Sequence, residues 1–351
     1  MPARVTVLRG DGIGPEVVEA ALGVLGALVP IHVREARVGG DAIDHDGDPL
    51  PPETLAACRD ADAVLLGAVG GPRWEGPLRA ETGLLKLRQG LGLYANLRPA
   101  RYLGLPTPLR EGLARGADLL VVRDLAGGVY FGEPRGQEGE EAFNTWRQTA
   151  EQARRVARFA FEAARLRRRR VTSVDKANVL EASRLWRAVV TGVGREYPDV
   201  EVEHRYVDAA SFELLQAPRR FDVILAENLF GDILSDELGA VVGSIGLLAS
   251  ASLGEGTPLF EPVHGSAPTL AGLGIANPTG AILSVAMMLR YALARPDLAV
   301  AVESAVESAL REVRTPDIGG NATTREFTVA VLRRLSRAPE EDGVSAYGWG
   351  V

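Results

Sequence analysis

Short apolar runs alternate with longer amphipathic stretches along most of this chain. The runs have the length and composition of buried strands, and they are Val5–Leu8, Asp62–Ala68, Asp118–Asp124, Val171–Val174, Val200–Val207 and Phe221–Asn228. Apolar residues spaced three and four apart predict helices up to about Leu28, at Thr145–Arg170, across 179–196, and at Ala281–Leu293 and Ala299–Val313. Strands that alternate with helices predict an α/β fold with parallel or mixed sheets flanked by helices.

Composition narrows the class of protein. A chain of 351 residues exceeds the usual size of one hydrophobic core, so we expect two domains. A net charge of −7 argues against a general nucleic-acid surface, and a single cysteine, Cys58, excludes an intrachain disulfide framework. No uninterrupted apolar stretch approaches the roughly 18 residues of a membrane span, and the N-terminus lacks the apolar core of a signal peptide. We expect a soluble, cytoplasmic protein without nucleic-acid or membrane partners.

Two glycine-rich segments stand out. RGDGIGPE (Arg9–Glu16) joins the first predicted strand to a helix, but its spacing is GxGxG and not the GxGxxG of a dinucleotide-binding fingerprint. A tight turn is therefore the favoured interpretation. The second segment, Gly243–Ile282, is rich in Gly, Ser and Pro, and its length predicts a functional loop.

Charged residues stand where predicted strands end. Arg123, Lys176 and Asp208 each close a strand, and Asp232 and Asp236 follow a fourth within FGDILSDE. If these strands are parallel, all five side chains gather at the sheet edge where α/β proteins bind ligands. The spacing of four places the two last aspartates on one helical face, where like charges need a cation. Taken singly, each residue is also compatible with a solvated surface charge.

A helix is also predicted at the start of ETGLLKLRQGLGLYANLRPARY (81–102), because Glu81, Leu84, Leu85 and Arg88 recur along one helical face. Further on, Arg98 precedes a proline that we expect to end any helix or central strand. The character of the chain changes there, and we place a domain crossing near residues 94–100.

Taken together, the motifs of this chain resemble those of the β-decarboxylating dehydrogenases from Val5 to about Leu335. They are GDGIGPE, ETGLLKLR, ANLRPA, GGVYFGEPRG, SVDKANVL, FGDILSDE and EPVHGSAP…GIANPT. The resemblance implies a two-domain isocitrate/isopropylmalate dehydrogenase-like fold that is not a Rossmann fold, in a homodimer whose active sites are shared between subunits. Residues 1–94 and 243–351 would form a cofactor-side domain. Residues 95–242 would carry the substrate, metal and dimer contacts.

The resemblance also implies roles for individual residues. Fork-shaped guanidinium groups suit the carboxylates of a malate-type substrate, and the implied ligands are Arg88, Arg98 and Arg123. Three carboxylates suit a hard Mg²⁺ or Mn²⁺ ion, and the implied set is Asp232, Asp236 and, from the second subunit, Asp208. Asp208 would also lie at the substrate.

Two residues would move protons, and a loop would bind the cofactor NAD. Lys176 of the second subunit would take the hydroxyl proton as hydride leaves for the nicotinamide, and Tyr130 would protonate the enolate that remains after loss of CO₂. The implied cofactor-binding residues are His264, Gly265, Ser266, Ala267, Pro268, Thr269, Leu270 and Asn277.

The residues beside Arg88 favour an apolar substituent on the substrate. Burying an unpaired carboxylate against Leu84 and Leu85 would cost several kcal/mol, whereas burying an apolar carbon contributes about 0.8 kcal/mol, and Glu81 would repel an anionic tail. The implied reaction is the oxidative decarboxylation of (2R,3S)-3-isopropylmalate to 4-methyl-2-oxopentanoate and CO₂ in leucine biosynthesis. Homoisocitrate, isocitrate and tartrate are alternative substrates. A non-catalytic regulatory subunit is a further alternative, which the presence of the tyrosine, lysine and aspartates disfavours.

Three features depart from the family pattern. After HGSAP, where the family usually has an acidic residue that bonds the adenosine ribose, this chain has Thr269. After Asp208 it reads AASF, so Phe212 is expected to repack a neighbouring helix or the dimer contact. The loop Gly71–Ala80 is shorter than in relatives, which would alter domain closure.

The first departure gives a testable prediction. Thr269→Asp should lower the KM for NAD by about tenfold or more, because a charge-assisted hydrogen bond contributes roughly 1.5–3 kcal/mol. Steady-state kinetics with varied NAD measure the effect. A KM that does not fall would show that this side chain does not lie at the ribose.

Overall fold

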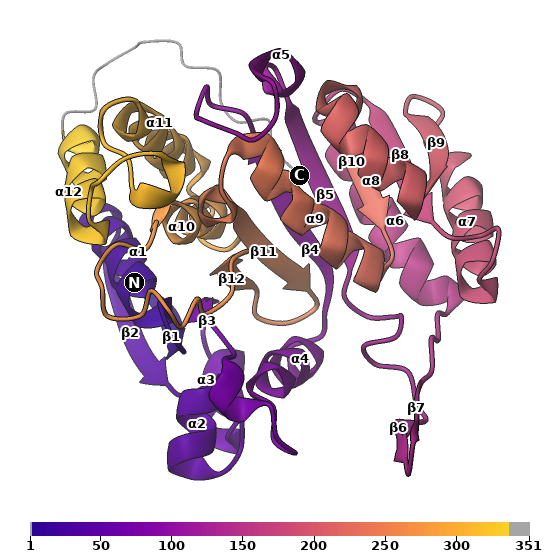
Figure 1. Ribbon diagram of the computed structural model, residues 1–351, viewed down its shortest axis with the longest axis horizontal. Helices are drawn as coiled ribbons and strands as arrows, with labels where there is room; N and C mark the ends of the chain where they lie inside the picture. The colour runs from indigo at the N-terminus through magenta and orange to yellow at the C-terminus, as the bar shows by residue number, and fades with distance from the viewer. Residues whose placement is uncertain (1, 337–351) are drawn as a thin grey trace. The chain divides into compact units, whose positions relative to one another are not determined.

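A computed structural model describes residues 2–336, and the chain folds as two compact units. Unit 1 combines the residues up to Leu93 with those from Gly243 onward, and unit 2 comprises Tyr94–Val242. Both are α/β, with mostly parallel strands flanked by helices, so the predicted fold class is confirmed (Figure 1). The assignment of cofactor binding to one unit and of substrate, metal and dimer contacts to the other stays a prediction. Residues 337–351 of the predicted cofactor-side domain lie outside the described residues.

The described part of unit 1 contains five strands in the order β2-β1-β3-β12-β11. β1 is parallel to β2 and to β3, and β3 is parallel to β12, whereas β11 is antiparallel to β12. Their bounds are β1 (Ala3–Gly10), β2 (Ile31–Ala36), β3 (Ala63–Ala68), β11 (Ala249–Gly254) and β12 (Leu259–Pro262).

The helices of unit 1 pack around α10, which is buried at every position from Thr279 to Leu289. α10 contacts α1, α11, β11 and β12, and it therefore forms the centre of the core of this unit. The helices are α1 (Gly14–Leu28), α2 (Gly39–Asp46), α3 (Pro52–Arg59), α4 (Ala80–Gly90), α10 (Thr279–Tyr291), α11 (Pro296–Glu312) and α12 (Thr324–Leu335), with short 3₁₀ turns η1 (Pro72–Trp74), η3 (Ile245–Leu247) and η4 (Pro316–Ile318).

The segment Gly243–Ile282 is not the long loop that its composition predicts, because it contains β11 and β12. Its small residues serve close packing. A Cβ atom at Gly280 would lie 2.5 Å from the carbonyl oxygen of Leu248, so only glycine lets α10 approach the chain there. The longest irregular part is the HGSAP stretch and the residues that follow it, up to the start of α10.

Five of the strands of unit 2 lie side by side in the order β4-β5-β10-β8-β9. β4 is antiparallel to β5, and the other neighbours are parallel, so β5, β10, β8 and β9 all end at one edge. This confirms the parallel arrangement on which the predicted gathering of charges depends. The bounds are β4 (Leu93–Arg101), β5 (Asp118–Asp124), β8 (Arg170–Asp175), β9 (Glu201–Tyr206) and β10 (Val223–Ala226).

The helices of unit 2 cover its strands, and a separate two-stranded hairpin extends away from them (Figure 1). The helices are α5 (Glu111–Ala114), α6 (Ala150–Arg165), α7 (Glu181–Gly194), α8 (Val207–Gln216), α9 (Asn228–Val242) and the 3₁₀ turn η2 (Pro218–Arg220). The hairpin pairs β6 (Arg135–Glu138) with β7 (Glu141–Asn144), and all of its residues are exposed.

Several boundaries differ from those predicted, and two of these differences have an identifiable cause. The helix expected at Thr145–Arg170 begins only at Ala150, because Thr149 and Gln152 form a capping box, and Arg170 already belongs to β8. Pro99 does not end a strand, because it pairs with Leu120 inside the β4–β5 ladder. The amide of Leu120 donates to Asp222 at 2.9 Å, away from β4. The missing N–H of Pro99 therefore costs no hydrogen bond to β5.

Candidate active site

The strands β4 and β5 place two arginines on the same face of the sheet. Asn96 is the antiparallel partner of Arg123, and Arg98 stands two residues further along β4, so all three side chains share that face. Helix α9 packs over it (Figure 1). A Cβ atom at Gly231 would lie 2.8 Å from the Cβ of Arg123, so this glycine allows α9 to come close. FGDILSDE therefore lies directly against the two arginines.

Arg123 is 1% exposed, and three of its nitrogens have partners on α9. Nη2 donates to Oδ1 of Asn228 at 2.8 Å, and Nε donates to the Asn228 carbonyl at 2.9 Å. Nη1 forms a short ion pair with Asp232. The strand thus presents a guanidinium whose orientation is fixed by one amide side chain and one carboxylate.

Arg98 is held in a similar way from the neighbouring strand. Its Nε donates to Oδ1 of Asn96 at 2.8 Å, and its Nη1 donates to Oγ of Ser235 at 2.8 Å. The same Nη1 lies 3.2 Å from Asp236, and Nη2 lies 3.3 Å from Asp232. Both predicted metal-binding aspartates of α9 therefore share one arginine, which confirms that they lie on one helical face.

The environment shifts the pKa of two groups in this cluster. The hydroxyl of Tyr130 donates to Oδ2 of Asp232 at 2.8 Å. Burial, followed by the charge of Asp232, raises the pKa of Tyr130 to about 12, so the phenol carries its proton at neutral pH. Burial also raises the pKa of Asp236, although Arg98 opposes this shift.

Lys176 and Asp208 form a second, separate group. Lys176 follows the end of β8, and its Nζ makes a short ion pair with Asp208. Asp208 was predicted to close a strand, but it lies in the first turn of α8. The hydrogen bond from Lys176 lowers the pKa of Asp208. In the part of the chain that the structure describes, no three His, Cys, Asp or Glu side chains are grouped to hold a metal ion. The carboxylate of Asp208 therefore does not join the two on α9 within one chain.

Helix α4 of unit 1 carries the residues predicted to select the substrate. Arg88 is 5% exposed, and its Nη2 donates to Glu261 of β12 at 2.7 Å, while its Nε has no partner among the described residues. Leu84 and Leu85 are half-buried, and Glu81 is exposed at the start of the helix. The helix thus keeps a buried guanidinium beside two partly exposed leucines.

The HGSAP loop is held against the first glycine turn. The amide of Ile13 donates to the carbonyl of Ser266 at 2.8 Å, and Ala267 adopts a φ of +39°, which is strained for a residue with a Cβ. His264 is buried, which lowers its pKa, and its Nε2 has no partner among residues 2–336. Thr269 and Leu270 are exposed.

Asn277 has a structural contact on each side of its amide. Its Nδ2 donates to Asp317 at 3.0 Å, and its Oδ1 accepts from the amide of Thr279 at 3.0 Å, at the start of α10. Its predicted contact with the cofactor stays a prediction.

Several polar residues of these clusters were not predicted from the sequence. Asn96, Asn228 and Ser235 orient the two arginines of unit 2, and Glu261 pairs with Arg88. The sequence contained a signal for one of these residues, Glu261. Glu261 is an isolated acid in the apolar run LFEP, and a buried carboxylate in such a strand requires a cationic partner. The amide and hydroxyl side chains carry no comparable signal, because their hydrogen bonds depend on the tertiary fold.

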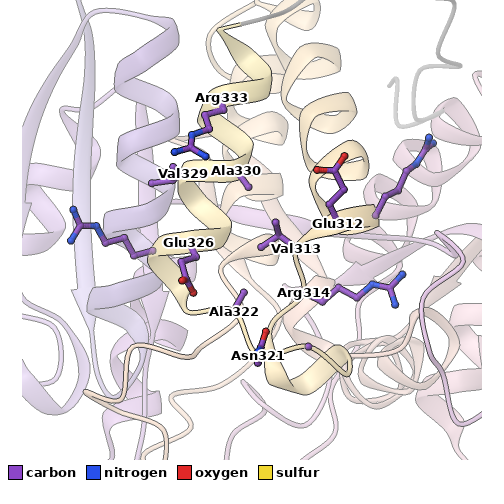
Figure 2. A pocket seen from close by; sticks show the side chains of 12 residues that line it. Glu312, Val313, Arg314, Asn321, Ala322, Glu326, Val329, Ala330 and Arg333 are labelled. Carbon is purple, nitrogen blue, oxygen red and sulfur yellow. The ribbon is translucent and has the colours of Figure 1, made fainter.

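Another concave surface of unit 1 lies between the end of α11 and α12, with a volume of about 750 Å³. Figure 2 shows Ala322, Val329 and Ala330 lining it, with Arg333, Glu326 and Glu312 around them. Glu312 is paired with Arg334, and Glu326 belongs to the capping box of α12. None of the predicted site residues lines this groove, so we assign it no part in the site.

Comparison with known proteins identifies the class. The family model described as "Isocitrate/isopropylmalate dehydrogenase" matches residues 4–331. Proteins named 3-isopropylmalate dehydrogenase from Aquifex aeolicus and Deinococcus radiodurans are 50% and 52% identical to this chain. The alignments cover 95% and 96% of this chain, and 97% and 99% of the respective relatives.

Solved structures agree with this result. An isocitrate dehydrogenase from Methylococcus capsulatus superposes with a TM-score of 0.87 at 36% identity, covering 95% of this chain and 99% of the other. A β-decarboxylating dehydrogenase from Thermococcus kodakarensis gives a TM-score of 0.80 at 38% identity, covering 97% of this chain and all of the other.

The fold, with its buried arginines and carboxylates at one strand edge, is that of a metal-dependent oxidoreductase acting on small organic acids. This chain belongs to the isocitrate/isopropylmalate dehydrogenase family. The family uses NAD and a divalent metal. None of the described helices has the length and apolar content that a membrane span requires.

Glu227, between the end of β10 and the start of α9, carries a buried carboxyl group. Glu227 is fully buried and accepts a hydrogen bond from Ser183, and Asp175 and Asp124 lie near enough to repel its charge. Burial is the main cause that raises the pKa of Glu227 from 4.5 to about 7. Between these two values the folded state binds more protons than the unfolded state.

This gives a pH-dependent stability. Glu227 should lower the free energy of unfolding progressively as pH rises from about 4.5 to about 7, and Glu227→Gln should remove this contribution. The variant should be more stable than the parent at pH 8 by up to about 3 kcal/mol, because one pKa unit corresponds to about 1.4 kcal/mol. Urea unfolding between pH 5.5 and 8 measures the difference.

Glu35→Gln is the matched control. Arg9 lowers the pKa of Glu35, so this carboxylate is ionised in both states above pH 5.5 and should not change the slope. A Glu227→Gln variant whose stability changes with pH as the parent's does would contradict the assignment.

Proposed function

We propose that this protein catalyses the NAD-dependent oxidative decarboxylation of 3-isopropylmalate in the cytoplasmic synthesis of leucine. The observation that carries the proposal is the pair of buried guanidinium groups, Arg98 on β4 and Arg123 at the carboxyl end of β5, held against two aspartates of α9. Two relatives about half identical over nearly the full chain carry the name of this activity.

The charges in the cluster support a divalent cation. Arg98 and Arg123 carry two positive charges, and Asp232 and Asp236 carry two negative charges, so the cluster is neutral on its own. A dicarboxylate substrate would add two negative charges that the cluster alone does not balance. An oxygen-only donor set on α9 suits Mg²⁺ or Mn²⁺, and we propose that Asp232 and Asp236 bind it with Asp208 of a second copy.

The arginines would bind the carboxylates of the malate portion. Arg123 and Arg98 are oriented by Asn228, Asn96 and Ser235, so both guanidinium groups are preorganised to meet an anion. Arg88 on α4 would provide the third guanidinium. Among the residues that the structure describes, its Nε has no hydrogen-bond partner, which fits a group that binds an acceptor on the substrate. The site would thus bind a compact dianion before any chemical step.

Two residues, Tyr130 and Lys176, would transfer protons during the reaction. When bound, a divalent cation would polarise the substrate oxygens, and NAD would accept the hydride from C2. The phenol of Tyr130 retains its proton, so it would supply that proton to the carbon that loses CO₂. Lys176 of the second copy would take the proton of the substrate hydroxyl. Its contact with Asp208 would place the lysine next to a carboxylate of the proposed metal site, and the lysine would act as the base once it has lost its own proton.

Exposed apolar side chains support a homodimer. Phe212 on α8 is 66% exposed and Ile233 on α9 is 52% exposed, and Ser211 and Glu237 join the two helices by a 2.7 Å hydrogen bond. A second copy would cover this apolar face. The exposed hairpin of β6 and β7 offers a further contact. In this arrangement the Lys176 and Asp208 of one copy would complete the aspartates and tyrosine of the other.

The substituent on C3 of the substrate would lie against α4. Leu84 and Leu85 favour an isopropyl group, and Glu81 disfavours a third carboxylate. We therefore prefer 3-isopropylmalate to isocitrate, homoisocitrate or tartrate as the substrate. A regulatory subunit without turnover would not require Tyr130 and Lys176 in their present places.

The activity can be tested directly. The purified protein should reduce NAD when given 3-isopropylmalate and Mg²⁺, lose this activity in EDTA, and regain it when Mg²⁺ or Mn²⁺ is added in excess. Isocitrate at the same concentration should give a kcat/KM at least about a hundredfold lower, because an unpaired buried carboxylate costs several kcal/mol. NADH absorbance measures both rates. Turnover of isocitrate but not of 3-isopropylmalate would overturn the proposal.

A further inference from the structure

The turn that joins β1 to α1 contacts more segments of unit 1 than a simple connection requires. Asp11, in the middle of GDGIGPE, is 4% exposed, and its carboxylate accepts three backbone hydrogen bonds. The donors are the amides of Gly40, Asp41 and Gly70, at 2.9, 2.9 and 2.8 Å. Because a buried carboxylate is costly unless it is fully hydrogen-bonded, these three amides are held firmly in place.

The first contact leads to α4 through the loop after β3. The space where a Cβ atom of Gly70 would lie is 2.5 Å from Oε1 of Glu81, the second residue of α4. The φ of +118° at Gly70 also excludes most other residues. By accepting a hydrogen bond from the amide of Gly70, Asp11 therefore fixes the backbone against which the start of α4 packs.

The second contact reaches the same helix through α2. Asp11 holds the first turn of α2, and the amide of Gly39 at its start donates to the carbonyl of Pro49 at 2.9 Å. That carbonyl lies 2.3 Å from where a Cβ atom of Gly83 would stand on α4. Two independent paths thus run from one carboxylate to the helix that carries Leu84, Leu85 and Arg88.

The other end of the turn contacts the HGSAP loop and the residues that follow. The amide of Ile13 donates to Ser266, and a Cβ atom at Gly12 would lie 2.0 Å from the same carbonyl oxygen. Three residues on, Oε1 of Glu16 accepts from the amide of Ala276 at 3.2 Å. The chain between Ser266 and Ala276 is therefore fixed at both ends by one turn.

We propose that GDGIGPE is a two-armed positioning element. Asp11 sets the place of α4 at the substrate, and Ile13 with Glu16 sets the place of the 264–277 segment at the cofactor. Neither Asp11 nor Glu16 touches a ligand in this arrangement, so both are positioning residues. The assignment of the arms to substrate and cofactor rests on the proposed function, whereas the hydrogen bonds that define the arms do not.

A crossed pair of variants tests the proposal. Asp11→Asn offers one acceptor oxygen to three amides and should raise the KM for 3-isopropylmalate about tenfold, with less than a twofold change in the dissociation constant of NAD. Glu16→Ala should do the reverse. Hydrogen exchange should be faster at Gly40, Asp41 and Gly70 in the first variant, and at Ala276 in the second.

Two further variants keep the test decisive. Gly70→Ala disturbs the first arm without changing Asp11 and should reproduce the substrate effect if Asp11→Asn does not fold. Glu303→Gln removes one partner of the buried Arg290–Glu303 ion pair and should lower stability while both ligand constants stay the same.

The outcomes separate the two proposals. Variants of both arms that shift the two constants together, or that lower only stability as Glu303→Gln does, would overturn the two-armed element. If the parent protein does not turn over 3-isopropylmalate, the proposed function fails, and the exchange rates and NAD titration still decide the role of the turn.

Discussion

The contact of α9 with the buried arginines of β4 and β5 determines how unit 2 is built around its site. Two guanidinium groups can be buried there because each of them has carboxylate and amide oxygens within hydrogen-bond distance, and Arg98 also has the hydroxyl oxygen of Ser235. Gly231 brings the helix close enough for those bonds, and the spacing of Asp232 and Asp236 directs both carboxylates to the same side. Before substrate binds, the positive charges of the two arginines are therefore balanced by the negative charges of the two aspartates. A dianionic ligand would need an additional cation to balance its own charge.

The same constraint explains why the described residues of one chain bring together only part of the proposed metal site. The strand order puts β5 beside β10, which joins Arg123 to α9, and β8 beside β9, which joins Lys176 to Asp208. The charged side chains of each neighbouring pair of strands thus form ion pairs within their own group. A third carboxylate for the proposed metal ion at α9 would therefore have to come from outside this chain. The exposed apolar residues on α8 and α9 support a second copy of the chain as its source.

Much of the fold could be predicted from local pattern, and much of the site could not. β5 matches its predicted range, and α1, α9, β8, β9 and β10 follow from apolar runs and helical spacing, whereas β4, β6 and β7 were not predicted. The predictions for Pro99 and for the Gly-rich segment were wrong because tertiary pairing outweighs local composition there. The direction of a proline's missing N–H, and the room that small residues leave for α10, depend on neighbours far along the chain.

The central claim is that residues of two copies complete one site, and a heterodimer tests it most directly. One copy would carry Asp232→Asn and the other Lys176→Met, with different affinity tags, and the mixed dimer would be purified through both tags. If the sites are shared, one site is intact and the other lacks both residues, so the heterodimer should show about half the parent activity. If each chain instead uses its own lysine and aspartate, both sites are damaged, and a heterodimer as inactive as the two parent variants would contradict the account.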